Sequence, residues 1–304
     1  MINGVLNIYK ESGYTSFDVV ARLRGILRQK KIGHTGTLDP MAEGVLIVCL
    51  GNATKLVDMI TSGDKCYEAT LKLGITTDTE DITGQMLTES DVNVTEEAVR
   101  SAILSFVGEY DQIPPMYSAI KKDGRKLYEY ARAGIEVKRE ARKVEIYSIE
   151  DIRIEALYAS FKVHCSKGTY IRSLCRDIGG RLGTGATLTA LKRSEVHGFE
   201  AKDALTVDEI SKLAEAGELS KYVLPADSLL MEYPAYHIED DYIKYLNNGN
   251  KLFNYQLVSD KIKGVRPEEE MIRVYDIKGL RALYIKTEEP NTYKPYKMFV
   301  DIRE

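Results

Sequence analysis

The sequence predicts a mixed α/β protein built around one sheet, with a smaller β unit at its C-terminal end. Over roughly residues 1–230, segments with the two-residue alternation of strands interleave with segments that have a helical period. From about residue 231 to 304, short runs rich in Tyr, Val and Ile are separated by turn-forming residues. A chain of 304 residues with 44% hydrophobic residues can bury a large domain core and a small one.

The first elements are defined by an alternating strand, an amphipathic helix and a glycine-containing loop. Val5–Tyr9 alternates as a strand does, and the turn after it ends at Gly13. Ser16 can cap the next helix, whose apolar positions recur every three or four residues. The glycines and the proline of residues 33–40 predict a loop, and the unbroken apolar run Val45–Leu50 predicts a buried strand. A short helix is expected to end near residue 60.

The remaining elements of the first part follow from the same patterns. We expect strands at 65–73, 144–155, 158–165 and 191–199, and helices at 94–106, 125–133, 170–182 and 207–216. Polar residues predict a loop at 76–84, and two adjacent prolines predict another at 111–118. The 76–84 loop lacks the ligand spacing and the closing glutamate of a calcium loop, so no metal site is expected there.

Composition excludes several classes of protein. No apolar run approaches the roughly 18 residues that span a bilayer, and residues 1–5 lack a signal-peptide pattern, so we expect a soluble cytoplasmic protein. The four cysteines form no Cys-x-x-Cys pair, so they are expected to be reduced and mostly buried, without zinc. No cofactor-binding or metal-binding motif is present, so none is predicted.

The charge distribution favours a nucleic-acid ligand, although the net charge of −4 argues weakly against one. Residues 22–31 carry five Lys or Arg and no acid, and residues 119–143 carry nine Lys or Arg against four Asp or Glu. Segregated positive charge can attract phosphate locally on an acidic protein. Ordinary solvated helix faces are the alternative interpretation of each run.

The stretch Gly33-His34-Thr35-Gly36-Thr37-Leu38-Asp39-Pro40 carries the strongest chemical signal. Its glycines allow a tight turn and close approach of a ligand, and Pro40 restricts Asp39 to an extended backbone. A carboxylate on a stiff loop beside a buried strand is a plausible catalytic group. By itself, however, an Asp-Pro in a glycine-containing loop is more often only a turn.

This segment resembles the catalytic motif of the TruB family, the bacterial tRNA pseudouridine-55 synthases. Further similar segments follow in the same order over roughly residues 1–230: Gly4–Lys10, Lys65-x-Tyr67, Thr77–Gly84, Gln112–Lys121, Gly124–Tyr128, Gly168–Leu174 and Leu191-x-Arg193. Glu11 stands where the family usually has a proline, which puts the rigidity of that turn in doubt. The resemblance implies a largely antiparallel sheet flanked by helices, a thumb-like RNA-binding insertion at about 112–143, and a PUA-like module at 231–304.

The resemblance also implies a role for each matching residue. Asp39 matches the catalytic aspartate, and Arg172 matches the arginine that pairs with it. Tyr67 matches the tyrosine that stacks on the target base. The other matches are His34, which helps to hold the RNA with the base extruded, and Tyr170 and Leu191, which line the uridine pocket.

The implied reaction isomerises uridine 55 in the T arm of tRNA. The bond from uracil N1 to ribose C1′ breaks, the ring turns, and C5 bonds to C1′, so no cofactor is needed. The base must be flipped out, and stacking on Tyr67 can offset that cost at about 1–3 kcal/mol per base. Asp39 has three possible roles: attack at C1′, attack at C6, or removal of a ribose proton. The acceptor of the C5 proton is also open, because tyrosine with its usual pKa near 10 is a poor base.

Two other functions remain compatible with the residues. One is a non-catalytic RNA-binding or RNA-folding protein, although binding alone would not require a carboxylate facing RNA. The other is the same reaction on ribosomal or small nuclear RNA. No obligate partner and no oligomer are indicated, so a monomer acting on tRNA is expected.

Overall fold

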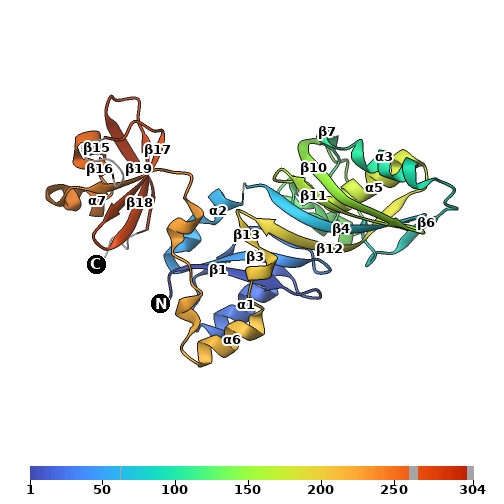
Figure 1. Ribbon diagram of the computed structural model, residues 1–304, viewed down its shortest axis with the longest axis horizontal. Helices are drawn as coiled ribbons and strands as arrows, with labels where there is room; N and C mark the ends of the chain where they lie inside the picture. Colours follow the sequence, from blue (N-terminus) through green and yellow to red (C-terminus); the bar gives the residue numbers. More distant parts are fainter. Residues whose placement is uncertain (62, 260–265, 300–304) are drawn as a thin grey trace.

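The structure is a computed structural model in which residues 1–61, 63–259 and 266–299 are described. Two sheets dominate it, a large one formed by the first part of the chain and a smaller one formed by the last (Figure 1). The strands of the large sheet are β1 (Gly4–Lys10), β2 (Ile32–His34), β3 (Glu43–Leu50), β4 (Lys65–Leu73), β7 (Gly108–Gln112), β10 (Arg142–Glu155), β11 (Tyr158–Cys165), β12 (Ala186–Val196) and β13 (Phe199–Glu200).

The large sheet consists of two halves that meet at a narrow junction. Its order is β1-β3-β12-β4-β11-β10-β7, with β2 beside β3 and β13 beside β12. All pairs are antiparallel except β3 with β12, which pair in parallel at only two positions, Glu43 with Lys192 and Gly44 with Arg193. Beyond these positions β3 pairs with β2 instead. The predicted mixed, largely antiparallel sheet is confirmed.

Helices bury the apolar faces of both halves. The helices of the first part are α1 (Ser16–Ile26), α2 (Val57–Ile60), α3 (Glu96–Leu104), α4 (Leu127–Arg132), α5 (Ile171–Leu182) and α6 (Val207–Glu215). Helices α1 and α6 cover one face of β1 and β3 through residues such as Leu23 and Ile210, and they lie together beneath this half in Figure 1. Helices α3 and α5 cover the other half, where Ile103 and Leu174 are fully buried.

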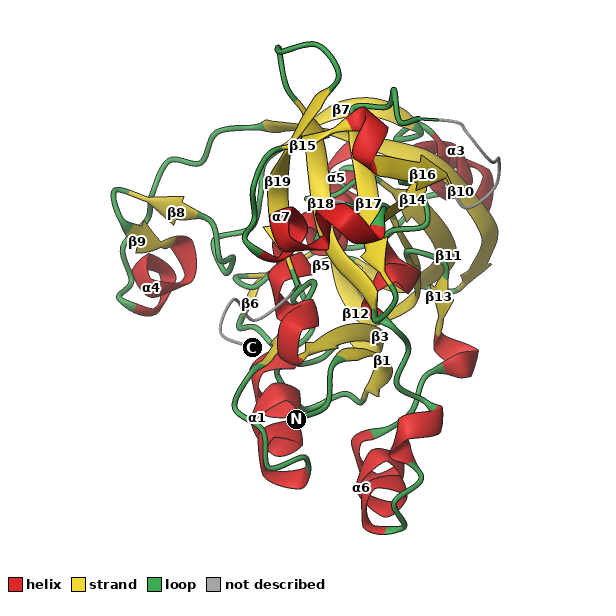
Figure 2. Cartoon of the chain, turned by 90° about the vertical axis from the view of Figure 1, so that its left-hand side faces the viewer, coloured by secondary structure: helices red, strands yellow, loops and turns green. Residues whose placement is uncertain are grey.

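Between β7 and β10, residues 113–141 leave the body of the protein. They form the hairpin of β8 (Lys121–Lys122) and β9 (Arg125–Lys126), followed by α4. Figure 2 shows this segment standing clear of the large sheet. Its base is anchored by Gln112, which is 1% exposed and bonds both backbone polar groups of Tyr170 at 2.8 and 3.0 Å. The segment therefore projects from the point where α5 begins.

The C-terminal part of the chain forms the second sheet, in the order β15-β19-β18-β17-β14-β16. Its elements are β14 (Ala235–Ile238), α7 (Ile243–Asn247), β15 (Leu252–Phe253), β16 (Leu257–Ser259), β17 (Met271–Asp276), β18 (Gly279–Lys286) and β19 (Thr292–Met298). It contacts the first part near α2, where Lys55 Nζ donates to the Met298 carbonyl at 2.6 Å and Lys297 Nζ donates to the Lys55 carbonyl at 2.7 Å.

Several element boundaries differ from the sequence predictions. Gly33 and His34 belong to the short strand β2, because their backbone pairs with Cys49 and Val48 of β3. The predicted loop 76–84 is framed by the hairpin of β5 (Ile75–Thr77) and β6 (Met86–Glu89). The predicted helix 125–133 is shorter, because residues 125–126 form β9. These corrections arise from pairing between distant segments, which local periodicity does not reveal.

Candidate active site

The loop after β2 places Asp39 beside the junction between the two halves of the sheet. Ser16 of α1 accepts a hydrogen bond from the Leu38 backbone at 2.9 Å, and the Gly13 backbone donates to the Pro40 carbonyl at 2.8 Å. The turn containing Glu11 is therefore fastened to the Asp39 loop, although it lacks the proline that stiffens it in the family pattern. The Asp39 side chain keeps 33% exposure.

A buried lysine donates hydrogen bonds to the backbone of the same loop. Lys10 is fully buried, and its Nζ donates to the backbone carbonyls of Glu11, Pro40 and Ala42 at 3.0, 3.3 and 2.6 Å. Burial lowers the pKa of Lys10 to about 8, and the negative charge of Asp39 opposes that shift. The sequence motif contained this lysine, but no pattern indicated that it contacts the loop.

Arg172, the second residue of α5, pairs with Asp39 through two contacts. Its Nε lies 2.8 Å from Oδ2, and its Nη2 donates to Oδ1 at 3.2 Å. Burial raises the pKa of Asp39, and the Arg172 guanidinium is the strongest influence opposing that rise. The nearby N-terminus of α5 also favours a negative charge. The ion pair that the resemblance implies is thus formed between these two side chains.

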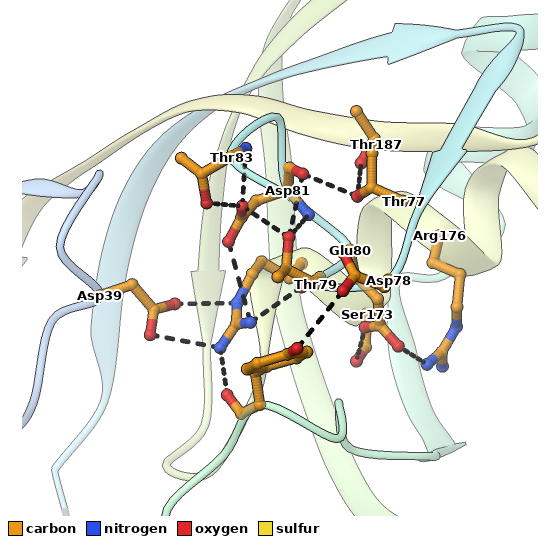
Figure 3. Close-up of polar contacts among 12 residues, drawn as sticks. Asp39, Thr77, Asp78, Thr79, Glu80, Asp81, Thr83, Ser173, Arg176 and Thr187 are labelled. Atoms are coloured by element: carbon orange, nitrogen blue, oxygen red, sulfur yellow. Dashed lines mark hydrogen bonds and ion pairs between the residues drawn. The ribbon is translucent and has the colours of Figure 1, made fainter. Parts of the chain in front are cut away.

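Two further partners of Arg172 belong to the 76–84 loop, whose Thr79 and Asp81 are labelled near Asp39 in Figure 3, and a third is Tyr117. The Thr79 carbonyl accepts from Nη1 at 2.9 Å, and Asp81 lies 3.8 Å from the same nitrogen. The Tyr117 carbonyl accepts from Nη2 at 2.9 Å. Asp81 is itself oriented by the hydroxyls of Thr79 and Thr83, at 2.8 and 2.5 Å. The loop therefore orients the arginine. No group of three or more His, Cys, Asp or Glu side chains that could hold a metal ion is found among the described residues.

A second buried carboxylate secures this loop to α5 and to the projecting segment. Glu80 accepts from the Ser173 hydroxyl at 2.7 Å, pairs with Arg176, and lies 3.6 Å from Arg139. Its φ of 64° shows that the backbone turns sharply at this point. Sequence analysis placed Glu80 and Asp81 in the Thr77–Gly84 segment but gave them no role, because their arginine partners lie far away along the chain.

Asp39 opens into a pocket of about 420 Å³ between the sheet, α5 and the base of the projecting segment. Its lining includes most of the predicted residues, namely Asp39, Tyr67, Tyr170, Arg172 and Leu191, together with Lys65, Tyr117, Ser118, Tyr128 and Arg193. This volume falls within the range of small-molecule sites and can receive one nucleoside. Burial raises the pKa of Tyr67 to about 12, so its hydroxyl stays protonated at neutral pH.

His34 is the predicted residue that does not line this pocket. It lies in β2, and its Nδ1 accepts from the Gly36 backbone at 3.4 Å. Burial, reinforced by the charge of Arg193, lowers the pKa of His34, so the ring is neutral at physiological pH. His34 therefore supports the pocket from behind Gly36, which lines it, and does not line the pocket itself.

A larger cavity of about 680 Å³ lies elsewhere, around Glu68, Lys162 and Lys192. These residues alternate along their strands with residues that face Tyr67, so they belong to the opposite face of the sheet. The cavity carries both signs of charge and contains neither Asp39 nor Tyr67. The predicted site residues Asp39 and Tyr67 therefore share the smaller pocket.

Comparison with known proteins identifies one family throughout. Residues 24–171 match the model of the TruB family pseudouridylate synthase N-terminal domain, and residues 172–231 match the tRNA pseudouridylate synthase B C-terminal domain. The chain is 44% identical to tRNA pseudouridine synthase B of Clostridium kluyveri, over 98% of this chain and 100% of that protein. It is 47% identical to the protein of the same name from Clostridium tetani, over 95% and 97% of the two chains.

Solved structures with the same fold include components of RNA–protein complexes. A chain in an H/ACA RNP bound to a substrate RNA containing 2′-deoxyuridine superposes with a TM-score of 0.73 at 25% identity, covering 99% of this chain and 86% of that one. A chain in a Cbf5-Nop10-Gar1 complex also has a TM-score of 0.73, at 28% identity over 98% and 85% of the two chains.

Proposed function

The chain belongs to the TruB family of pseudouridylate synthases, and from this premise we propose that it converts uridine 55 in the T arm of tRNA to pseudouridine. Formation of pseudouridine in tRNA, an isomerisation, follows from its curated relatives. The choice of the T arm rests on the family pattern and on the projecting segment 113–141. The observation that carries the proposal is the Asp39–Arg172 ion pair, which opens into a pocket lined by Tyr67 and Leu191.

The pocket can assist each part of this reaction. Tyr67 and Leu191 provide the surfaces between which an extruded uracil ring is held. Asp39 is the charged group positioned to act when the bond from N1 to C1′ breaks, because a fixed carboxylate stabilises positive character at the sugar. Arg172 keeps that carboxylate ionised and oriented. The N1–C1′ bond breaks, the C5–C1′ bond forms, the C5 proton leaves to solvent and N1 takes up a proton, so the atoms balance without a cofactor.

A tritium-release assay tests the proposal. An unmodified tRNA transcript labelled with tritium at uridine C5 is mixed with the purified chain alone, and tritium appearing in water is counted. We expect release, with one tritium lost per tRNA labelled only at uridine 55. Transcripts labelled at other positions are the control. Release from those positions would reject the assignment to the T arm, and binding of tRNA without any release would favour the non-catalytic function.

The same assay addresses the need for partners. The Asp39–Arg172 pair and Tyr67 already line one pocket, so turnover by the purified chain without an added protein is the expected result. The two structural neighbours described above were solved in complexes. No helix among the described residues is long and apolar enough to cross a membrane.

The segment 113–141 is assigned to gripping the RNA, because it places basic side chains next to the pocket. Arg125 lies over the Tyr130 ring at 4.8 Å, and Arg132 over the Tyr128 ring at 5.3 Å, while Tyr128 also lines the pocket. Aromatic rings paired with arginines offer both stacking and charge to RNA. The C-terminal sheet is proposed as a PUA-like RNA-binding unit on the basis of the family pattern alone.

Replacing Lys121, Arg125 and Arg132 together with glutamine is expected to weaken tRNA binding and leave kcat at saturating tRNA unchanged. The binding constant for tRNA falls as salt rises, so a plot of its logarithm against log salt has a negative slope. Each lost phosphate contact makes this slope shallower by about 0.7–0.9. Titrations of tRNA at several salt concentrations measure this slope. The matched control replaces Lys202, Lys212 and Lys221, which are also exposed but lie in or near α6. Equal affinity and slope in the two triple variants would remove the RNA-gripping role of the segment.

A further inference from the structure

The junction between the two halves of the sheet contains a buried arginine to which neither the resemblance nor the comparisons assign a role. Arg193 of β12 is 2% exposed and is among the largest fully buried side chains of the protein. Among the described residues, no carboxylate lies within 4.0 Å of its guanidinium. Burying a charge without a carboxylate is costly, so this arginine must contribute something that an apolar side chain could not.

The side chain of Arg193 bridges strand β3 and the loop that carries Asp39. Its Nε donates to the Val45 carbonyl of β3 at 2.7 Å, and its Nη2 donates to the Gly36 carbonyl of the Asp39 loop at 3.1 Å. Arg193 thus connects β3 to the Asp39 loop, at a position three residues before Asp39. A guanidinium can do this because its donors diverge in a rigid plane.

The backbone of Arg193 fixes the other end of the same loop. Gly44, its partner in the two-residue parallel pairing, has a φ of +104°, and a Cβ at this position would lie 2.2 Å from the Arg193 carbonyl oxygen. Only glycine allows this contact. The segment 36–44, which includes Asp39, therefore starts and finishes against one residue of β12.

Arg193 also acts on Tyr67, across the pocket from Asp39. The positive charge of Arg193 and a hydrogen bond from its side chain both lower the pKa of Tyr67, against the larger effect of burial. The residues pair directly in the sheet, with Arg193 of β12 opposite Tyr67 of β4. Arg193 is therefore bonded through its guanidinium to the loop that carries the carboxylate and is paired in the sheet with the tyrosine proposed to stack on the base.

From these contacts we infer that Arg193 is a positioning residue for the isomerisation, which sets the separation between Asp39 and Tyr67. The inference rests on the proposed function, since that function makes these two groups the ones that flank the target nucleoside. Arg193 acts through its neighbours: its guanidinium is held by the protein's own acceptors. A displacement of about 1 Å at a reacting group costs about a hundredfold in rate, which sets the expected size of the effect.

The test compares Arg193→Lys, Arg193→Ala and the control Lys192→Met. Lysine keeps a positive charge of similar reach but cannot bond the carbonyls of Val45 and Gly36 from one planar group. Lys192 is the adjacent residue, on the opposite face of the sheet, and its 3.4 Å pair with Glu68 is partly exposed. Single-turnover tritium release at saturating tRNA, tRNA affinity and Tm are measured for each variant.

We expect Arg193→Lys to fold, to bind tRNA within about twofold of the wild type and to lose about a hundredfold in rate, as misplacement predicts. Lys192→Met should match the wild type. Millimolar guanidinium, well below denaturing concentrations, should restore part of the rate to folded Arg193→Ala, because it can reoccupy the emptied site. Loss of packing alone would not be corrected by this ion.

Other outcomes would overturn the inference. Wild-type rate in Arg193→Lys would show that the two hydrogen bonds of the guanidinium are dispensable. Weaker tRNA binding with an unchanged rate would make Arg193 a phosphate-binding residue instead. A folded Arg193→Ala protein without rescue would reduce its role to general stability. Failure of the proposed function is separate from these outcomes, because it would appear as absent tritium release from the wild-type protein.

Discussion

Replacing Asp39 with asparagine is expected to abolish tritium release while tRNA binding stays intact or becomes tighter. The amide has nearly the same shape, and Arg172 keeps its bonds to the carbonyls of Thr79 and Tyr117. The pocket therefore retains its form but loses the only pocket-lining carboxylate in the described part of the chain. Loss of a preorganised charge at the reacting bond costs at least about a thousandfold. Tighter binding is plausible because a carboxylate facing RNA repels phosphate.

Glu43→Gln is the matched control for this variant. Glu43 lies four residues further along and also carries a carboxylate, but it faces the larger cavity on the other side of the sheet. The control should release tritium at the wild-type rate. Comparable release from Asp39→Asn would assign the chemistry to another group. Loss of tRNA binding by Asp39→Asn would show instead that Asp39 mainly supports the RNA-binding surface.

Replacing Arg172 with lysine is expected to preserve the fold and remove most of the activity, about a hundredfold at neutral pH. Arg172 is 4% exposed and contacts Asp39 at two atoms, with Thr79, Tyr117 and Asp81 around the rest of the guanidinium. The lysine ammonium donates from a single point and cannot reproduce this planar arrangement. Tritium release and thermal unfolding of the variant measure the two effects separately.

The pH dependence gives this variant a second readout. The pKa of Asp39 is already raised by burial, and Arg172 opposes that rise. Weakening the pair therefore raises this pKa further, so Asp39 becomes protonated at a higher pH. The acidic limb of the pH–rate profile then shifts to higher pH. Activity of Arg172→Lys should recover partly at alkaline pH. Arg181→Lys, on the same helix but at the surface, is the control. Near-full activity of Arg172→Lys at neutral pH would refute the pairing.

The sequence was informative where function depends on local pattern. The alternation of Val5–Tyr9 and the apolar run Val45–Leu50 predicted β1 and β3 correctly, and the glycine loop between them holds Asp39 as expected. The family pattern then identified Arg172, which lies 133 residues from its partner. Periodicity alone could not have paired them, because it says nothing about which loops meet.

What the sequence left out is the set of buried polar contacts that hold the site together. Lys10, Glu80 and Asp81 looked like ordinary charged residues, since a sequence does not show whether a charge is solvated or surrounded by backbone carbonyls. The two-residue parallel pairing of β3 with β12 had no local signal either. It depends on the close approach of Gly44 to Arg193, which becomes visible only when both strands are in place.

The contact of Arg172 with the Tyr117 carbonyl has an energetic consequence for the working enzyme. Tyr117 lies at the base of the segment that is proposed to grip RNA, and Arg172 orients the carboxylate that is proposed to act in catalysis. A movement of this segment on tRNA binding would therefore change the orientation of Asp39 through Arg172. Thermodynamic reciprocity requires the reverse as well, so a pocket already set for reaction holds its tRNA more strongly. Binding of tRNA and the orientation of Asp39 for reaction are then thermodynamically coupled.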